Sequence, residues 1–309
     1  MKMSTATLSK EDAWEAFKQV LKPQCQSIFT HAGLNIPFFV TPENIAEAAS
    51  LPLDPSDVWI ATYAKAGTTW TQNIVKLIRN KGEKDGVQLM LSVPWAEANS
   101  DQSRFKVNLF TLPKPRAFKS HLTYDLMPCG KPSTTPCKYI YVARNPKDVA
   151  VSYFFHYIRM SVRKDATLDW DIFFRNFIYG NVDFGDFFDH VLSWWPHRNE
   201  DNVLFLMFED MKKDPRAAIT RIATFIGADF SDEVIDKVVA QTSFDSMKKD
   251  DTANYSAVSF MFNPGSTPFM RKGEVGDWRN RLTPEQSAEI DQLCEEKLKD
   301  TGLVFDFGD

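Results

Sequence analysis

The chain has few cysteines, and none of them are arranged as a pair. Four cysteines occur among its 309 residues, and no two form a Cys-x-x-Cys motif. They are Cys25, Cys129, Cys137 and Cys294. This spacing indicates neither a metal site nor a redox-active pair, so we expect free thiols and no bound metal. Reduced thiols are typical of a reducing compartment, which predicts a cytoplasmic protein.

Long apolar runs and a surplus of positive charge are also missing. No run of about 18 apolar residues occurs, and the first 12 residues are polar and charged, so we expect no membrane span and no export signal. The formal net charge is −5, from 36 lysines and arginines against 41 aspartates and glutamates. Such a chain has no global positive field that draws nucleic acid or an anionic membrane. Any bound anion has to be held by local groups.

Hydrophobic residues, in contrast, are plentiful: they make up 43% of the chain and include 25 phenylalanines, enough for a large core. Strand patterns occur at residues 57–61, 115–122, 138–143 and 202–208. Helical patterns occur at residues 11–21, 71–78, 149–160, 169–180, 186–195, 214–225, 231–240 and 284–299. Buried strands separated by helices predict an α/β fold with a central, mostly parallel sheet flanked by helices. We expect a single domain over residues 1–309 with a flexible segment at 1–10, and extended, proline-punctuated segments at 36–42 and 51–55.

Residues 62–70 join the first strand to a helix through a turn that contains Lys65 and Gly67. The first N–H groups of the helix, its dipole and the lysine charge all attract an anion, so a phosphate or sulfate is the expected occupant. The segment is P-loop-like without being a Walker loop, because Thr62 and Thr68 stand where that motif has its first glycine and its lysine. A kinase or NTPase is therefore a weaker hypothesis. From this segment alone, a plain surface turn with a solvated lysine stays open.

Three further places carry candidate site residues. Lys119 and His121 are two residues apart in a short strand, so they share a face on which the histidine can take a proton and the lysine can stabilise negative charge. Arg144 follows a long strand, at the carboxyl end where open α/β sheets bind ligands. The segment 271–273, Arg-Lys-Gly, can offer side-chain donors and a bare N–H to one anion. The plainer interpretation is that these groups are structural or solvated.

These segments together resemble the cytosolic sulfotransferase family. Five separated motifs carry the resemblance, in order along nearly the whole chain. They are Lys65–Trp70; Lys119-Ser120-His121; Arg144 with Ser152; Thr242-Ser243-Phe244; and Arg271-Lys272-Gly273 with Gly276-Asp277-Trp278. Their joint occurrence outweighs any single motif.

The resemblance implies a donor, 3′-phosphoadenosine 5′-phosphosulfate (PAPS), which leaves as 3′-phosphoadenosine 5′-phosphate (PAP). It also implies catalytic roles for His121 as the base and for Lys65 and Lys119 beside the sulfuryl group. The donor-binding residues that it implies are Lys65, Ala66, Gly67, Thr68, Thr69, Trp70, Arg144, Ser152, Phe208, Thr242, Phe244, Phe269, Met270, Arg271, Lys272 and Gly273. The implied acceptor is a small, largely apolar molecule with a hydroxyl or amine, such as a phenol, alcohol or steroid. Positioned cations and N–H groups stabilise the leaving phosphate in such a transfer, so no metal is implied.

The chain departs from the family pattern at several positions. Ala64 and Ala66 stand where the family loop usually has proline and serine, and Phe208 stands where a tyrosine often contacts the nucleotide. The family dimer motif, Lys-x-x-x-Thr-Val-x-x-x-Glu, is represented by Arg279, Thr283, Pro284 and Ala288, so a homodimer through this segment is not assumed. A nucleotide-binding protein without turnover is a second hypothesis. Trp95, in a loop, either caps the core or walls an apolar pocket.

Overall fold

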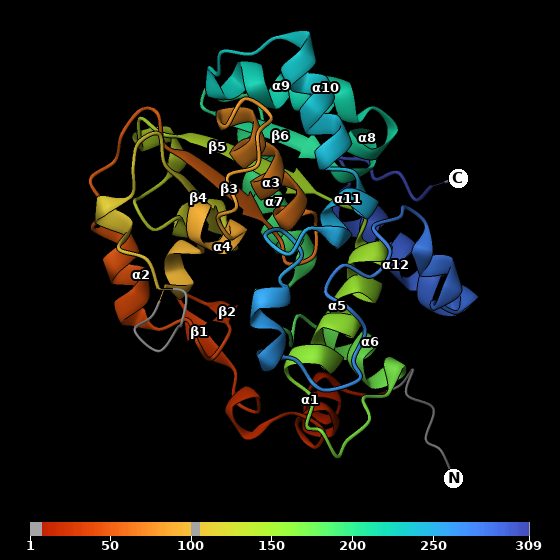
Figure 1. The fold of residues 1–309 in the computed structure, drawn as a ribbon. Helices are drawn as coiled ribbons and strands as arrows, with labels where there is room; N and C mark the ends of the chain where they lie inside the picture. Colours follow the sequence, from red (N-terminus) through yellow and green to blue (C-terminus); the bar gives the residue numbers. More distant parts are fainter. Residues whose placement is uncertain (1–7, 100–105, 309) are drawn as a thin grey trace. The chain divides into compact units, whose positions relative to one another are not determined.

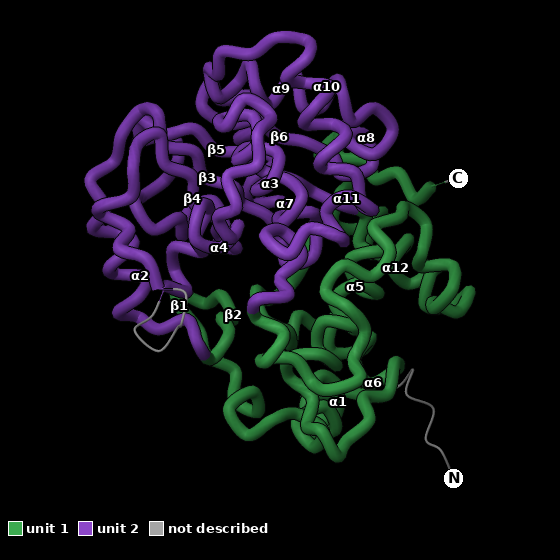
Figure 2. Tube along the Cα trace, viewed as in Figure 1, with its two compact units in different colours: residues 1–38, 145–190, 258–309 green, residues 39–144, 191–257 purple. Residues whose placement is uncertain are grey.

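The computed structural model describes residues 8–99 and 106–308, which form two compact units (Figure 2). Unit 1 comprises residues 1–38, 145–190 and 258–309, and unit 2 comprises residues 39–144 and 191–257. The expected flexible segment at 1–10 falls largely on residues 1–7, outside the described residues. The expectation of a single domain over the whole chain stays a prediction.

Unit 2 is built on a four-stranded parallel sheet (Figure 1). Its strands are β3 Val58–Thr62, β4 Ala117–Ser120, β5 Lys138–Ala143 and β6 Val203–Met207, in the order β4-β3-β5-β6. Ile60 in β3 lies opposite Lys119 in β4 and Ile140 in β5. All five residues of β3 are buried, as its unbroken apolar run predicts for a central strand. The predicted α/β fold with a mostly parallel sheet is confirmed.

Helices cover this sheet. Those of unit 2 are α2 Pro42–Ala49, α3 Thr68–Arg79, α4 Leu89–Ser92, α8 Phe208–Lys213, α9 Pro215–Ile226, α10 Asp232–Gln241 and α11 Phe244–Lys249. Helix α3 packs on β3 and β4, while α9 and α10 pack on α3 and on each other. Tyr139 and Tyr141 share one face of β5 and pack on Trp194, whose ring stacks 5.0 Å from that of Tyr141. Trp194 ends α7 Phe187–Trp194, whose first four residues belong to unit 1.

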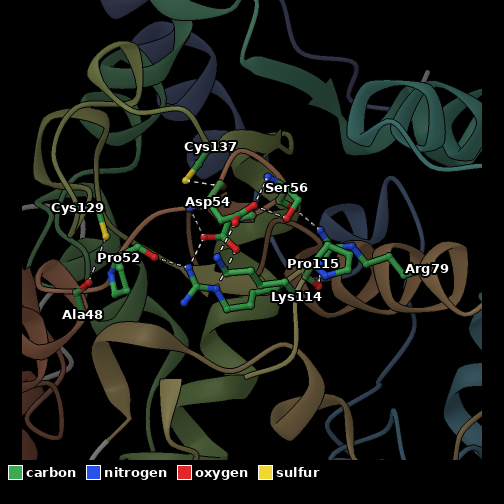
Figure 3. Close-up of polar contacts among 11 residues, drawn as sticks. Ala48, Pro52, Asp54, Ser56, Arg79, Lys114, Pro115, Cys129 and Cys137 are labelled. Carbon is green, nitrogen blue, oxygen red and sulfur yellow. Dashed lines mark hydrogen bonds and ion pairs between the residues drawn. The ribbon is translucent and has the colours of Figure 1, made fainter. Parts of the chain in front are cut away.

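A buried ion pair joins the amino-terminal ends of β3 and β4. Arg116 Nε donates to Asp57 Oδ1 at 2.9 Å, and the two residues are only 2% and 0% exposed. Two further cations hold the same end of the sheet (Figure 3): Lys114 binds Asp54 at 2.6 Å, and Arg79, the last residue of α3, donates to the carbonyls of Ser56 and Pro115 at 3.0 and 2.9 Å. Charged groups therefore fix the amino-terminal end of the sheet, and the carboxyl ends of the strands lie at its other edge.

Unit 1 is mainly helical. Its elements are α1 Lys10–Lys18, the antiparallel hairpin of β1 Phe29–His31 and β2 Leu34–Ile36, α5 Pro146–Met160, α6 Trp170–Ile178 and α12 Pro284–Lys297. Aromatic rings form its core: Phe173 of α6 lies 6.1 Å from Phe17 of α1 and 5.5 Å from Phe154 of α5, measured between ring centroids. The expected start of α5 is confirmed, with Asn145 capping the helix and Pro146 as its first residue.

Several predicted boundaries were wrong. Phe208 does not end the fourth strand; it is the first residue of α8, with Glu209 and Asp210 in the first turn, where acids favour a helix start. Pro42 is not extended but is the first residue of α2, capped by Thr41, because proline fits the first helical position. The hairpin of unit 1 and the short helix α11 were not predicted.

Candidate functional site

A residue that we predicted from the sequence as a site residue follows the carboxyl end of every strand of the parallel sheet. The loop Tyr63–Gly67 follows β3, His121 follows β4, Arg144 follows β5 and Phe208 follows β6. Because the strands are parallel, these four exits lie at one edge of the sheet, which is where open α/β sheets bind ligands.

The loop after β3 leaves the start of α3 without a side-chain cap. Its N-cap is Gly67, in the left-handed region with φ +113°, and no side chain accepts a bond there. Side-chain oxygens cap α1, α2, α5, α6, α9, α10 and α12. The first-turn N–H groups at Thr68, Thr69 and Trp70 therefore have the orientation that binds an anion, and Lys65, held at φ +72°, adds its charge to the same turn.

Arg144 and Phe208 pack around this loop. The Arg144 guanidinium lies 4.4 Å from the centroid of the Phe208 ring, and its Nη1 donates to the Lys65 carbonyl at 3.5 Å. Phe208 also packs on Trp70 in a T-shaped arrangement, with ring centroids 5.5 Å apart. A methyl group built on Gly67 would lie 2.9 Å from Phe208 Cδ2, so only glycine fits here. The structure thus brings together Lys65, Gly67, Trp70, Arg144 and Phe208.

The His121 ring is held by the last residue of β3. Its Nδ1 lies 2.8 Å from the Thr62 carbonyl oxygen, which can only accept, so this bond assigns the ring proton to Nδ1. Nε2 is then the nitrogen that carries the lone pair and can take a proton. The Thr62 hydroxyl bonds that of Thr68 at 2.6 Å, so one threonine links the histidine to the start of α3.

Lys119 and His121 both contact Trp95, although the predicted strand over residues 115–122 was too long: β4 ends at Ser120, and His121 follows it. The Lys119 Nζ lies 4.0 Å from the centroid of the indole, and the imidazole stands perpendicular to it with centroids 5.0 Å apart. Phe39 packs on the same indole at 5.4 Å. Burial lowers the pKa of Lys119 to about 8, and the charge of Glu97 partly opposes this shift.

Glu97 is a site residue that no sequence motif indicated. It lies in the short 3-10 helix Ala96–Ala98, is fully buried, and accepts the Ser120 hydroxyl at 2.9 Å and the His121 N–H at 2.8 Å. Burial raises the pKa of its carboxyl above the usual range, although these hydrogen bonds oppose the shift. Its only signal in the sequence is its place beside Trp95, in a loop whose fold could not be predicted.

Two further predicted residues of unit 2 lie at the junction of α10 and α11. Thr242 is the buried C-cap of α10, and its hydroxyl donates to the Val238 carbonyl at 2.8 Å. Phe244 is the first residue of α11, with Lys248 Nζ 5.9 Å from its ring centroid. Both therefore lie where the two helices meet.

The remaining predicted residues belong to unit 1. Asp277 binds both Arg271 and Lys272, and the Arg271 guanidinium lies 4.4 Å from the Phe155 ring on α5, the helix that also carries Ser152. The Asp148 carboxylate at the start of α5 accepts the Gly276 and Trp278 N–H groups at 2.9 and 3.0 Å. The loop with Arg271, Lys272 and Gly273 is therefore fixed to the helix of Ser152. Just before it, Phe269 stacks on Phe262 and Met270 follows.

The described residues carry no cluster of three or more His, Cys, Asp or Glu side chains that could hold a metal ion. Within residues 8–99 and 106–308, the helices are too short or too polar for one to span a bilayer. All four cysteines are outside any disulfide, as expected.

This architecture is that of an anion-binding α/β protein of the phosphate-loop type, with a histidine beside the loop. Residues 55–302 match the family model described as "Sulfotransferase domain". The chain belongs to this family and is a sulfotransferase.

Known relatives support the assignment over most of the chain. The chain is 38% identical to sulfotransferase 1C2 of Rattus norvegicus over 274 residues, which cover 86% of this chain and 90% of the relative. It is 40% identical to the amine sulfotransferase of Oryctolagus cuniculus over 257 residues, covering 81% and 83%. Mouse sulfotransferase SULT7A1 in complex with PAP matches the structure with a TM-score of 0.70 at 32% identity, covering 88% and 94%. Retinol dehydratase in complex with androsterone and PAP matches with a TM-score of 0.80 at 26% identity, covering 94% and 95%.

Proposed function

We propose that this sulfotransferase transfers the sulfuryl group of PAPS to a hydroxyl or amine of a small, largely apolar acceptor in the cytoplasm. The observation that carries the proposal is the uncapped start of α3, linked through Thr62 to a histidine whose Nε2 can accept a proton. The solved complexes of related proteins with PAP support the donor. Retinol and androsterone, bound by retinol dehydratase, and the name of the amine sulfotransferase support the acceptor class.

In the proposed reaction, His121 Nε2 removes the proton from the acceptor while the acceptor oxygen or nitrogen attacks sulfur. A new bond to sulfur forms as the bond from sulfur to the bridging oxygen breaks, and PAP leaves with the electron pair of that bond. Lys65 and the first N–H groups of α3 offset the charge that grows on the leaving phosphate, and Lys119 steadies the sulfuryl oxygens. A positioned base of this kind contributes roughly 10²- to 10⁴-fold to the rate.

The other roles concern donor recognition. The loop Lys65–Thr69 would hold the 5′-phosphosulfate, and Trp70, Phe208, Thr242, Phe244, Phe269 and Met270 would contact the adenosine. The 3′-phosphate would be taken by Arg144, Ser152, Arg271, Lys272 and the Gly273 N–H. Arginine and lysine donors of this kind would distinguish PAPS from a nucleotide that lacks a 3′-phosphate.

A transfer assay tests the proposal. The purified protein is incubated with PAPS labelled in the sulfuryl group and a panel of phenols, alcohols, sterols and amines. We expect transfer to at least one acceptor, a loss of roughly 10²-fold or more for His121→Ala with PAP binding retained, and little change for His31→Ala on the hairpin of unit 1. Tight PAP binding without transfer to any acceptor would refute the proposal. Magnesium-dependent ATP hydrolysis would instead favour an NTPase.

A further inference from the structure

We infer that Glu97 is a positioning residue for sulfuryl transfer: its buried carboxylate accepts the Ser120 hydroxyl and the His121 N–H, and so anchors the segment that joins Lys119 to His121. The inference rests on the roles proposed above for His121 and Lys119. Glu97 lies outside the motifs that the sequence indicated, and it would link His121, the proposed base, and Lys119, the proposed cation, to one acidic residue.

The first part of the inference comes from how His121 is held. The last paired residue of β4 is Ser120, opposite Ala61, so His121 lies one residue beyond the ladder. Its N–H is bound by Glu97 at 2.8 Å, while Nδ1 of its ring is bound by the Thr62 carbonyl at 2.8 Å. One hydrogen bond on the main chain and one on the ring therefore hold His121 and set the direction in which its Nε2 points.

The position of Glu97 is itself fixed by the edge of the sheet. β4 is the first strand in the order β4-β3-β5-β6, and the segment before Glu97 runs along it. The Lys119 N–H donates to the Pro94 carbonyl at 2.8 Å, and Trp95 forms a parallel bridge with Lys119. The backbone next to Glu97 is therefore already paired with β4, the strand that contains Lys119 and precedes His121.

The second part of the inference is electrostatic. A fully buried carboxylate is costly unless hydrogen-bond donors compensate it, and here the Ser120 hydroxyl and the His121 N–H donate to it. Burial lowers the pKa of Lys119 to about 8, and the charge of Glu97 is what raises it against this effect. Lys119 is protonated below its pKa, so removing the charge of Glu97 lowers that pKa further and discharges Lys119 at a lower pH.

Other charged groups near β4 already have partners of their own. β3, from Val58 to Thr62, has no ionisable residue. On α3, Lys76 pairs with Asp85 at 2.7 Å and Arg79 donates to backbone carbonyls. Arg116, at the start of β4, pairs with Asp57. Among the charged groups described in unit 2, Glu97 is the one that raises the pKa of Lys119 against the effect of burial.

The decisive variant is Glu97→Gln, whose amide oxygen can still accept both hydrogen bonds although the charge is gone. We expect the alkaline limb of the pH profile of kcat/KM to move to lower pH by roughly one unit, with PAP binding at pH 7 unchanged. Glu97→Ala also removes the acceptor, and we expect kcat to fall about 10- to 100-fold because Nε2 is no longer aimed. Glu209→Gln, a second buried glutamate of the same unit, serves as the matched control and should leave the limb in place.

A direct titration separates this inference from the proposed function. The lysines are labelled with ¹³C by reductive methylation. The signal that is lost in Lys119→Arg is assigned to Lys119, and its chemical shift is then followed by NMR as the pH is changed. An Lys119 pKa that is equal in wild type and Glu97→Gln overturns the inference, whether or not the enzyme turns over. A lowered pKa in an enzyme that transfers nothing supports the inference on electrostatics and refutes only the proposed function.

A third variant decides the matter if Glu97→Gln fails to fold. Arginine stays charged far above pH 8, so the alkaline limb should disappear in Lys119→Arg. An unchanged limb in that variant would show that Lys119 does not titrate in the profile and would overturn the inference.

Discussion

At the scale of single residues, Gly67 is a position of the anion-binding loop that only glycine fits. It needs φ +113°, and a Cβ there would press on the Phe208 ring at 2.9 Å. We expect Gly67→Ala to lower the free energy of unfolding by about 1–3 kcal/mol and to weaken PAP binding at least about tenfold, because the loop must shift. Thermal melts and calorimetric titration with PAP measure the two effects.

Gly86 provides the control for this substitution. It also has a left-handed backbone, φ +71°, but a Cβ there meets nothing within 4 Å. Gly86→Ala should therefore show the backbone strain alone and bind PAP like the wild type. Equal PAP affinities for the two variants would contradict the role of the contact with Phe208.

Arg271 is the residue on which 3′-phosphate recognition is most easily tested. Asp277 and the Phe155 ring hold its guanidinium in place, so the side chain is preorganised. We expect Arg271→Ala to weaken PAP binding roughly 10- to 100-fold while binding of adenosine 5′-monophosphate barely changes. Arg279→Ala removes a cation of the following 3-10 helix, Asp277–Asn280, which lies over Trp278, and should leave the ratio of the two affinities unchanged. A similar loss for both nucleotides in Arg271→Ala would argue against a contact with the 3′-phosphate.

At the scale of elements, the buried pair of Asp57 and Arg116 sets how β3 and β4 begin. Removing one partner leaves a buried charge, so Asp57→Asn should lower the free energy of unfolding by about 3–5 kcal/mol in urea denaturation. Asp229→Asn breaks an exposed contact with Lys81 and should have no measurable effect. A small loss in Asp57→Asn would mean that water reaches Arg116 when the pair is broken.

The elements also show which signals the sequence carries and which it does not. Long apolar runs predicted β3, β5 and β6. β3 and β5 have such runs because a central parallel strand is buried on both faces, whereas β6 is an edge strand and only partly buried. The glycine turn before α3 was also visible in the local sequence. The end of β6 was missed because Phe208 is apolar and continues the run, although the acids after it favour a helix. Glu97 was missed because its importance depends on packing against β4, a strand 20 residues later in the chain, and no local pattern records that contact.

At the scale of the whole molecule, the cations that the motifs singled out belong to a chain of net charge −5. The structure gives each of these cations a local partner that fixes its direction. Arg144 lies on the Phe208 ring, Lys119 on the Trp95 ring, and Asp277 holds Arg271 and Lys272. The cations could be found from the motifs. Most of the partners could not, because rings and acids of this kind are common and only the fold says which of them face a cation.

The segment that resembles the family dimer motif is used within the chain. Thr283 caps α12 in a capping box with Gln286, Pro284 is the first residue of that helix, and Arg279 donates to the Phe307 carbonyl at 3.1 Å. These residues serve local structure of unit 1, so we expect the protein to be a monomer at micromolar concentration. Sedimentation equilibrium should give a mass close to 35.4 kDa, the same for the wild type and for Arg279→Ala. Twice that mass in the wild type, halved by Arg279→Ala, would show instead that the segment pairs two copies despite its changed sequence.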